Sequence, residues 1–326
     1  MMNIELMVNN RKKWMVIAAI LTGAGVLFCT ISSAILGFSF KKLGFAKYVT
    51  NTYNVSESFE NINIKGDTEN ISFVLAEDGN CKVVCSEDEK NPHDVRVENN
   101  TLMIDRTSNS KLQLNIGIST ESPEIIVYLS QKEYEILTID TDTGDIMIPK
   151  DFSFESMNIQ LDTGDISNQA SANESICIKT DTGDITVSDV SAVDMKLTSD
   201  TGRMEISNIV LTGNFDLSEQ TGKVTMENVS CKKFTSNGTT GSLIMTNVIA
   251  AEEFQLKRDT GNIEFNGCDA ETIYAKTTTG DVRGTLLSEK VFITETDTGN
   301  IDVPKTIAGG KCEITTDTGD INIKIQ

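Results

Sequence analysis

A spacing of 19 or 20 residues recurs along the last two thirds of this chain and limits its possible folds more than any other feature. Ten Thr-Gly steps mark the repeat. So constant a period indicates one structural unit used ten times, which is typical of solenoid proteins. The glycines are Gly144, Gly164, Gly183, Gly202, Gly222, Gly241, Gly261, Gly280, Gly299 and Gly319.

Apolar and polar residues alternate on both sides of each glycine. The second residue after the glycine is aliphatic or methionine in every copy, as in Ile146 and Val224. Alternation with a period of two predicts one strand with a buried face before the glycine and a second, short strand after it. The residues seven positions before the glycines are apolar in every copy: Leu137, Met157, Ile176, Met195, Phe215, Phe234, Phe254, Ile273, Phe292 and Cys312.

A second corner follows the short strand. Asp189, Asn208, Asn228, Asn247 and Gly267 stand six positions after their glycines, and an apolar residue follows each of them. These residue types favour turns. Each unit is therefore predicted to contain a strand, the Thr-Gly corner, a second strand, the Asx corner and a short segment that leads to the next unit. A unit of about 19 residues cannot bury its own apolar face unless copies stack on one another. It is also too short for a propeller blade, which needs about 40 residues. The sequence therefore predicts an all-β, parallel β-solenoid with about 19–20 residues per coil.

The repeat also sets the boundaries of the β region. Residues 136–326 are predicted to form the regular ten-repeat solenoid, and residues 55–135 an irregular β cap containing the first coils. The stretch 67–71 (DTENI) mimics the repeat motif, with Glu69 in place of the glycine. The C-terminal coil, built around Gly319, has no cap of its own, so we expect its edge to be open to a partner or to water.

The N-terminal region predicts a membrane anchor. No charged residue occurs from Trp14 to Phe38, and these 25 residues are enough for a helix to cross a bilayer. We expect one transmembrane helix over 14–38, a short cytoplasmic tail over 1–13 and a linker over 39–54. A cleaved signal peptide is the alternative, since Ser32–Ala34 resembles a processing site.

Charge divides the chain into two unlike parts. The net charge at pH 7 is −20, yet residues 1–50 carry +5, so the remaining 276 residues carry −25. So acidic a body repels phosphate backbones, and nucleic acid is not an expected partner. It would also be repelled by an anionic inner leaflet. We therefore expect a single-pass protein of the cell membrane, with a cytoplasmic N-terminus and an extracytoplasmic body.

An acidic column is the candidate site. It lies two positions before the glycines, and stacking would bring its carboxylates to within about 5 Å of one another, where calcium could bridge them. An Asp at this position also suits a turn that holds no ion. Copies with Gln220, Thr239 and Thr278 keep the glycine, so we expect the motif to specify a corner, with calcium binding as the alternative and no other cofactor. The column comprises Asp142, Asp162, Asp181, Asp200, Asp259, Asp297 and Asp317.

Catalytic residues are not evident. No nucleophile-plus-base set, phosphate loop or zinc spacing occurs. His93, beside Pro92 in a charged stretch, is expected to be a solvated loop residue. Cys81 and Cys85 would be about 13 Å apart in one strand, too far for a disulfide, and the cysteines are expected to be reduced. The sequence favours a non-enzyme, and a polysaccharide-active β-helix enzyme is a second alternative.

The segment EIIVYLSQKEYEILTIDTDTGDI, at 124–146, together with the TGDI units that follow it, resembles the bacterial DUF4097 family of β-strand-repeat proteins, also labelled adhesin. The resemblance covers about residues 55–326, and it departs from the family pattern at Leu129-Ser130, where members often have Leu-Pro. It implies a body outside a bacterial membrane, behind an N-terminal anchor. It carries over no catalytic or ligand residues.

Taken together, these features predict a membrane-anchored extracytoplasmic β-solenoid that acts as a non-catalytic surface interaction module, adhesin-like or associated with envelope stress. The membrane is the expected partner of Trp14–Phe38. A protein, a peptide or the envelope itself is the expected partner of the body.

Overall fold

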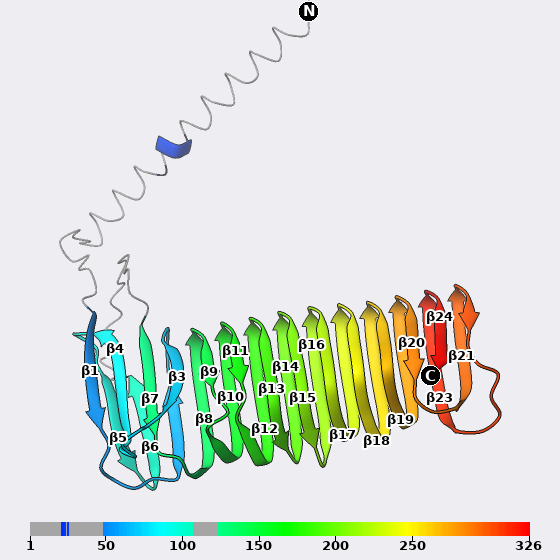
Figure 1. Ribbon diagram of the computed structural model, residues 1–326. Coiled ribbons are helices and arrows are strands. Elements are labelled where there is room, and N and C mark those ends of the chain that lie inside the picture. The colour runs from blue at the N-terminus through cyan, green and yellow to red at the C-terminus, as the bar shows by residue number, and fades with distance from the viewer. Residues whose placement is uncertain (1–20, 24, 26–47, 107–122) are drawn as a thin grey trace, which may run out of the picture. The chain divides into compact units, whose positions relative to one another are not determined.

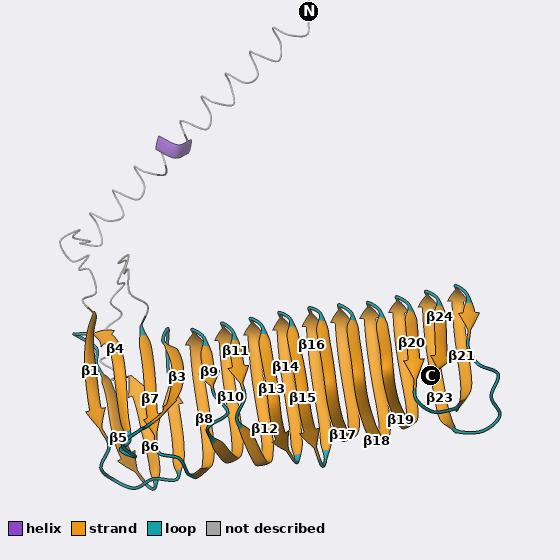
Figure 2. Ribbon diagram, viewed as in Figure 1, coloured by secondary structure: helices purple, strands orange, loops and turns teal. Residues whose placement is uncertain are grey.

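The computed structural model describes residues 21–23, 25, 48–106 and 123–326. Residues 48–106 and 123–326 form 24 strands of one continuous sheet, which winds in successive coils around a single core (Figure 1). Nearly all of this unit is strand, with short loops at the corners (Figure 2). The prediction of an all-β parallel solenoid is confirmed.

The regular coils stack in the register that the sequence alignment predicts. Ile176 in β12 pairs with Met195 in β14, which in turn pairs with Phe215 in β16, all in parallel. The strands of these coils are β8 (Glu133–Thr143), β9 (Ile146–Ile148), β10 (Ser153–Thr163), β11 (Ile166–Asn168), β12 (Ser171–Thr182), β13 (Ile185–Ala192), β14 (Asp194–Thr201), β15 (Met204–Leu211), β16 (Asn214–Thr221), β17 (Val224–Thr240), β18 (Leu243–Thr260), β19 (Ile263–Thr279) and β20 (Val282–Leu286).

The core is filled by the inward columns. Residues that pair across coils pack on one another along the stack, and aromatic rings follow this path in its middle. The ring centroids of Phe215 and Phe234 lie 5.2 Å apart and those of Phe234 and Phe254 6.1 Å. Phe265, from another inward column, lies 6.4 Å from Phe254. Since one coil cannot enclose these side chains, each coil depends on its neighbours for burial.

The Thr-Gly corner needs glycine for two reasons. Gly183 has φ +148°, in the region that L side chains rarely adopt. A Cβ built on it would lie 1.9 Å from the carbonyl oxygen of Gly164 in the preceding coil. Its N–H donates to the carbonyl of Thr201 in the following coil at 2.9 Å. The corners therefore stack backbone on backbone, with no room for a side chain.

The second corner is built from left-handed Asx residues, as predicted. Asp189, Asn208, Asn228 and Asn247 have φ values of 60°, 56°, 55° and 52°. Their side chains form a ladder: each asparagine amide donates to the side-chain oxygen of the preceding member at 2.8–3.0 Å. Gly267 continues the column with φ 65°.

The N-terminal coils are irregular, as expected for a cap. β2 and β3 stack on β8 and β9, and β6 and β7 stack on the other side of β2 and β3. Three strands then pair antiparallel: β5 with β6, β4 with β7, and β1 with β4. β1 lies within the segment predicted as a linker. These strands are β1 (Tyr48–Asn54), β2 (Asn61–Lys65), β3 (Asn70–Leu75), β4 (Lys82–Asp88), β5 (His93–Glu98), β6 (Thr101–Arg106) and β7 (Glu124–Leu129).

The prediction that the coil of Gly319 forms the open edge is wrong. The coil of β23 and β24 stacks directly on β19 and β20, and the coil of β21 and β22, which precedes it in sequence, lies outside it. The exchange leaves Thr294 half-buried at the end of the stack and puts Ile314 fully inside. The open edge therefore belongs to 290–302 and not to the coil of Gly319. The strands are β21 (Lys290–Thr298), β22 (Ile301–Asp302), β23 (Gly310–Thr318) and β24 (Ile321–Ile325).

Most of the predicted transmembrane helix, 14–38, lies outside the described residues. Residues 21–23 and 25 are its described part, and they are helical. Within the part of the chain that the structure describes, no helix has the length and apolar character to cross a membrane.

Candidate functional site

The acidic column is a feature of the solenoid surface. Asp142, Asp162, Asp259, Asp297 and Asp317 are exposed at their corners, and Asp181 and Asp200 are partly exposed. Asp181 pairs with Lys179 at 2.9 Å, and Asp200 accepts a hydrogen bond from Gln220 of the next coil at 2.7 Å. The seven aspartates thus stand at equivalent corners of the coils, with Asp317 on the inner side of Asp297. Calcium binding by the column stays a prediction.

The acid that follows the glycine has a structural role. The carboxylate of Asp145 accepts the backbone N–H of Asp165 at 3.0 Å, Asp165 accepts that of Asp184 at 2.8 Å, and Asp184 accepts that of Arg203 at 2.7 Å. Asn262 makes the same contact with the N–H of Asp281 at 2.9 Å. Because an uncharged amide oxygen serves equally well, the ladder needs an acceptor at this position and not a charge.

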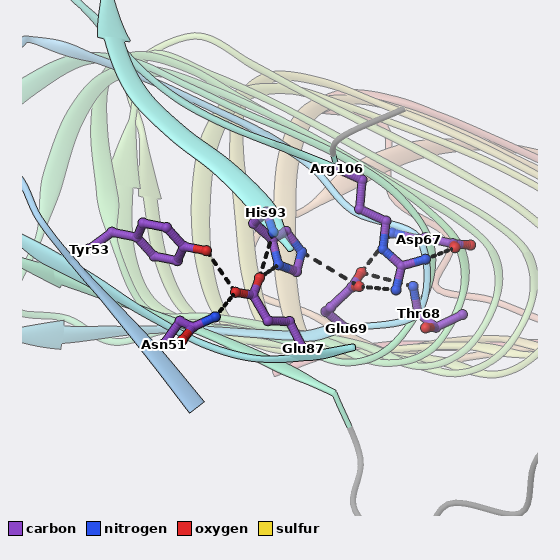
Figure 3. A network of polar contacts seen from close by, with 8 residues as sticks. All are labelled: Asn51, Tyr53, Asp67, Thr68, Glu69, Glu87, His93 and Arg106. Atoms are coloured by element: carbon purple, nitrogen blue, oxygen red, sulfur yellow. Dashed lines mark hydrogen bonds and ion pairs between the residues drawn. The ribbon is translucent and has the colours of Figure 1, made fainter. Parts of the chain in front are cut away.

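A buried polar network lies in the cap, and it overturns the prediction for His93. This residue is 4% exposed and begins β5, instead of lying in a solvated loop. The antiparallel pairing of β5 with β6 turns its imidazole toward the cap interior, where it meets Glu87 of β4 and Glu69 of the corner between β2 and β3 (Figure 3). Both glutamates are also buried.

The contacts of His93 and Glu87 join three strands and one corner of the cap. The imidazole Nδ1 lies 2.5 Å from Glu87 Oε2, and its Nε2 lies 3.6 Å from Glu69 Oε1. Glu87 Oε1 also accepts hydrogen bonds from Tyr53 Oη and Asn51 Nδ2, each at 2.6 Å. Figure 3 shows these contacts meeting between β1, β4 and β5. This His93 network therefore fixes the antiparallel strands of the cap to one another.

Glu69 links the network to the first coil. Its Oε2 accepts the backbone N–H groups of Asp67 and Thr68 at 2.8 and 2.9 Å, and its Oε1 lies 2.7 Å from Arg106 Nη2. Arg106 also pairs with Asp67. Arg106 thus faces Glu69, and His93, when protonated, is a second cation beside both buried glutamates.

The electrostatics favour the charged forms. Burial alone would raise the pKa of Glu69, but the contact with His93, the hydrogen bond from the Asp67 backbone and the charge of Arg106 lower it to about 2. The pKa of Glu87 is lowered in the same way by Tyr53, Asn51 and His93, against burial. Burial would lower the pKa of His93, yet the two glutamates raise it overall.

A metal centre is a weaker interpretation of this cluster. Ligand atoms of Cys85, Glu87 and His93 lie within 4.8 Å of one another. However, both Glu87 oxygens already accept hydrogen bonds, and burial, followed by the charges of Glu87 and Glu69, raises the pKa of the Cys85 thiol to about 12. A divalent cation would have to displace these bonds and ionise that thiol, so the side chains fit an ion-pair network better.

One signal for this network was present in the sequence. Glu69 occupies the glycine position of the motif, and its backbone carbonyl does lie above Gly144, as the glycines do elsewhere. An acidic residue at a corner position that is otherwise glycine indicates that its side chain has an interaction partner within the fold. Its partners could not be inferred from the repeat. His93 and Arg106 come close to Glu69 only because β5 pairs antiparallel with β6 and because β6 stacks beside β2.

A shallow groove crosses the outer face of β17, β18, β19 and β23. Asn237, Gln255, Lys257, Tyr274 and Glu313 are among the residues that line it. It combines one aromatic ring with amide, cationic and acidic groups on adjacent coils. Lys311 Nζ lies 4.9 Å from the ring centroid of Tyr274 and makes a cation–π contact with it.

The chain matches one family profile and is similar to several solved structures. The Toastrack DUF4097 family profile matches residues 59–219 and 212–326. A "putative adhesin" of Bacteroides fragilis is a similar solved structure, with 15% identity, coverage of 85% of this chain and 97% of that one, and a TM-score of 0.40. A "putative lipid binding protein" of Parabacteroides distasonis has 16% identity, coverage of 72% and 96%, and a TM-score of 0.47. No curated protein matched.

Proposed function

Because the chain belongs to the Toastrack DUF4097 family, we propose that it is a membrane-anchored, extracytoplasmic interaction module that binds its partner through the outer faces of the solenoid and catalyses no reaction. The adhesin-like role that family resemblance implies is one form of this function, and a role in envelope stress is another. Both need a rigid surface held away from the membrane.

The strict register of the coils is the observation that carries this proposal. Parallel pairing keeps equivalent positions in line, so Thr235, Gln255, Tyr274 and Glu313 form one row of outward side chains over adjacent coils. A row spaced at about 4.8 Å presents polar groups at fixed intervals. Such extended surfaces are what solenoid proteins use for binding.

The groove around Tyr274 is the part of this surface best suited to a partner. An aromatic ring with amide and charged groups beside it can supply apolar contact and directed hydrogen bonds together. The anchor and the location rest on the charge-free stretch Trp14–Phe38 and on the acidity of the body. Both features favour an extracytoplasmic body over a cytoplasmic one.

Site-specific photocrosslinking in intact cells tests the proposal. A crosslinker replaces Tyr274 in the full chain, and a matched variant carries it at Val210, an exposed residue on β15. We expect a covalent adduct of defined mass from position 274 and none from position 210. Equal adducts from both positions, or none from either, would contradict a partner at this groove.

Location is tested separately by treating the same cells with trypsin. An extracytoplasmic body is cleaved without lysis, because it carries many lysines and arginines. Protection of the body until lysis would contradict the proposed topology.

Calcium binding is the second candidate, and the alignment of seven aspartates in one surface column favours it. An ion that binds only the folded state raises the melting temperature in proportion to the logarithm of its concentration. We expect at most a small shift at millimolar calcium, since neighbouring lysine and glutamine side chains already contact part of the column. A clear shift, abolished by replacing Asp142 and Asp162 with asparagine, would support the calcium module.

A further inference from the structure

The groove around Tyr274 lies on a closed part of the sheet. Its strands β17, β18, β19 and β23 each pair with a neighbour on both sides. Their backbone N–H and C=O groups are therefore occupied within the solenoid, and an extended peptide cannot add to them as a further strand. A partner in this groove must be recognised by side chains alone.

Two rows of polar side chains run through the groove along the solenoid axis. Neighbours within a row are about 4.8 Å apart, and the two rows are about 6.6 Å apart, which is two residues along each strand. The groove holds about 530 Å³, within the usual range of ligand sites, roughly 300–1,000 Å³. One row contains Gln255 and Tyr274, and the other consists of Asn237, Lys257, Lys276 and Thr315.

The amide side chains of the groove are available to a ligand. Asn237 and Gln255 are exposed, and neither amide makes a hydrogen bond with another described residue. The amides of the Asx corner differ, since Asn208, Asn228 and Asn247 bond to one another. An amide offers a donor and an acceptor side by side, which suits hydroxyl groups that both donate and accept.

Tyr274 supplies the groove with an aromatic surface. Among the described residues after β7, every other aromatic ring is buried or packed against the core. Tyr274 itself lines the groove, whereas Lys311, which contacts its ring, does not. The negative face of an aromatic ring attracts the polarised C–H groups of a sugar ring. An aromatic ring with free amides beside it is therefore suited to a pyranose.

The groove is electrically balanced within a strongly acidic body. Two lysines and two glutamates line it, whereas residues 51–326 carry −25, which is −20 for the chain less +5 for residues 1–50. An anionic polymer would be repelled by the body, with no excess of cations in the groove to offset the repulsion. A cationic peptide would meet Lys257 and Lys276 there. Charge complementarity therefore favours an uncharged ligand.

We propose that this groove binds a linear, uncharged glycan that lies along the solenoid axis. One pyranose ring lies against Tyr274, and hydroxyl groups bond to the amides of Gln255 and Asn237. The strand spacing of about 4.8 Å is close to the length of one sugar unit in an extended chain, so successive units meet successive coils. The assignment rests on the proposed interaction module, whose partner it specifies.

Calorimetric titration of the full-length chain with hexasaccharides tests the proposal, in a mild detergent whose head group contains no sugar. The probes are cellohexaose, chitohexaose and mannohexaose, which are uncharged, and hexagalacturonate, which is anionic. We expect at least one uncharged hexasaccharide to bind, and hexagalacturonate to bind at least about tenfold more weakly. Equal or tighter binding of hexagalacturonate would overturn the assignment of an uncharged ligand.

Variants connect the binding to the groove. Tyr274→Ala should raise the dissociation constant at least about tenfold, because it removes the stacking surface. Gln255→Ala, at an exposed residue, should raise it about threefold to tenfold, as expected for one lost hydrogen bond. The matched control Val210→Ala changes an exposed residue of β15 and should leave it unchanged. If Tyr274→Ala fails to fold by circular dichroism, Gln255→Ala decides.

The glycan and the interaction module can fail separately. Absence of binding by all three uncharged hexasaccharides, or binding that both variants leave unchanged, would overturn the glycan. A protein adduct at position 274 in intact cells, without hexasaccharide binding, would keep the interaction module and remove only its glycan partner. With neither an adduct nor hexasaccharide binding, both proposals fail.

Discussion

At the scale of single residues, the repeated motif separates into parts with different roles. The glycine is required by φ and by the backbone above it, the acid after it supplies a hydrogen-bond acceptor, and the acid before it faces solvent. The acids are replaced in several of the ten regular coils, whereas the glycine and the threonine before it have no substitute in any of them.

Gly183→Val should therefore destabilise the fold far more than Asp181→Asn. The valine Cβ would meet the Gly164 carbonyl at 1.9 Å and the backbone would be strained, which should cost about 3 kcal/mol or more of unfolding free energy. Asp181 loses one exposed ion pair, a change of about 0.5 kcal/mol at most. Urea titrations measure both values. Comparable losses that calcium restores would show instead that the corner is an ion site.

The His93 network predicts a stability optimum between two pH limits. The raised pKa of His93 contributes stability that is complete below the ordinary histidine pKa, about 6.5, and is lost as pH rises through the folded-state value. The lowered pKa of Glu69 contributes stability above its ordinary value of 4.5, and this is lost as pH falls toward about 2. Melting temperatures across this range should show both losses. His93→Gln should remove the loss at high pH and, because His93 also lowers the pKa of Glu69 and of Glu87, should reduce the loss at low pH.

At the scale of elements, three neighbouring coils share one buried ion pair. The column three positions before the glycine usually holds threonine, as in Thr277, whose hydroxyl donates to the Gly261 carbonyl at 2.9 Å. Three successive coils instead have Glu219, Gly238 and Arg258. Arg258 Nη1 passes the glycine, where an added Cβ would lie 1.8 Å away, and comes within 3.7 Å of Glu219 Oε2.

Removing one member of this pair should lower the free energy of unfolding more than removing both members. Arg258→Thr leaves Glu219 buried without a counter-charge, and such changes cost about 3–5 kcal/mol. The double variant Glu219→Thr/Arg258→Thr restores the column's usual residue and should come within about 1 kcal/mol of the wild type. A double-mutant cycle in urea measures the coupling. Additive losses would contradict a coupled pair.

Local pattern was sufficient to predict the coil and its two corners, because every copy repeats the same constraints. Periodicity alone predicts Leu137 and Ile146 as inward-facing and Asn208 as a corner residue, and all three lie as predicted. It could not place His93, since its partners Glu69 and Glu87 come together only through antiparallel strands that interrupt the repeat. Residues that break the pattern, such as Glu69 and Arg258, proved to be those with buried partners.

At the scale of the whole solenoid, the sequence repeat could not predict the stacking order of the last two coils. The corners at Gly299 and Gly319 have the same local sequence requirements, so either coil can follow that of Gly280. The choice depends on which coil better tolerates an exposed side. Thr294 stands in the column where coil 310–325 has the fully buried Ile314, so 290–302 tolerates the terminal position better.

The alternative order should form when the competing coil is removed. In a chain ending after Gly309, coil 290–302 can stack directly on β19, so Ile293 would come opposite Tyr274. In the full chain Glu313 lies between them, so two strand spacings, about 9.6 Å, separate the backbones at positions 274 and 293. The variant Tyr274→Cys/Ile293→Cys should therefore form a disulfide only when shortened. A disulfide in the full chain as well would contradict the exchanged order.

This exchange has a consequence for biosynthesis. Coil 290–302 leaves the ribosome before coil 310–325, and at that moment the free edge of β19 and β20 is the nearest complementary surface. It can dock there as a temporary terminal coil, and must detach when β23 and β24 arrive to occupy the inner position. Folding of this end then includes a strand displacement, which can be no faster than the release of the temporary coil.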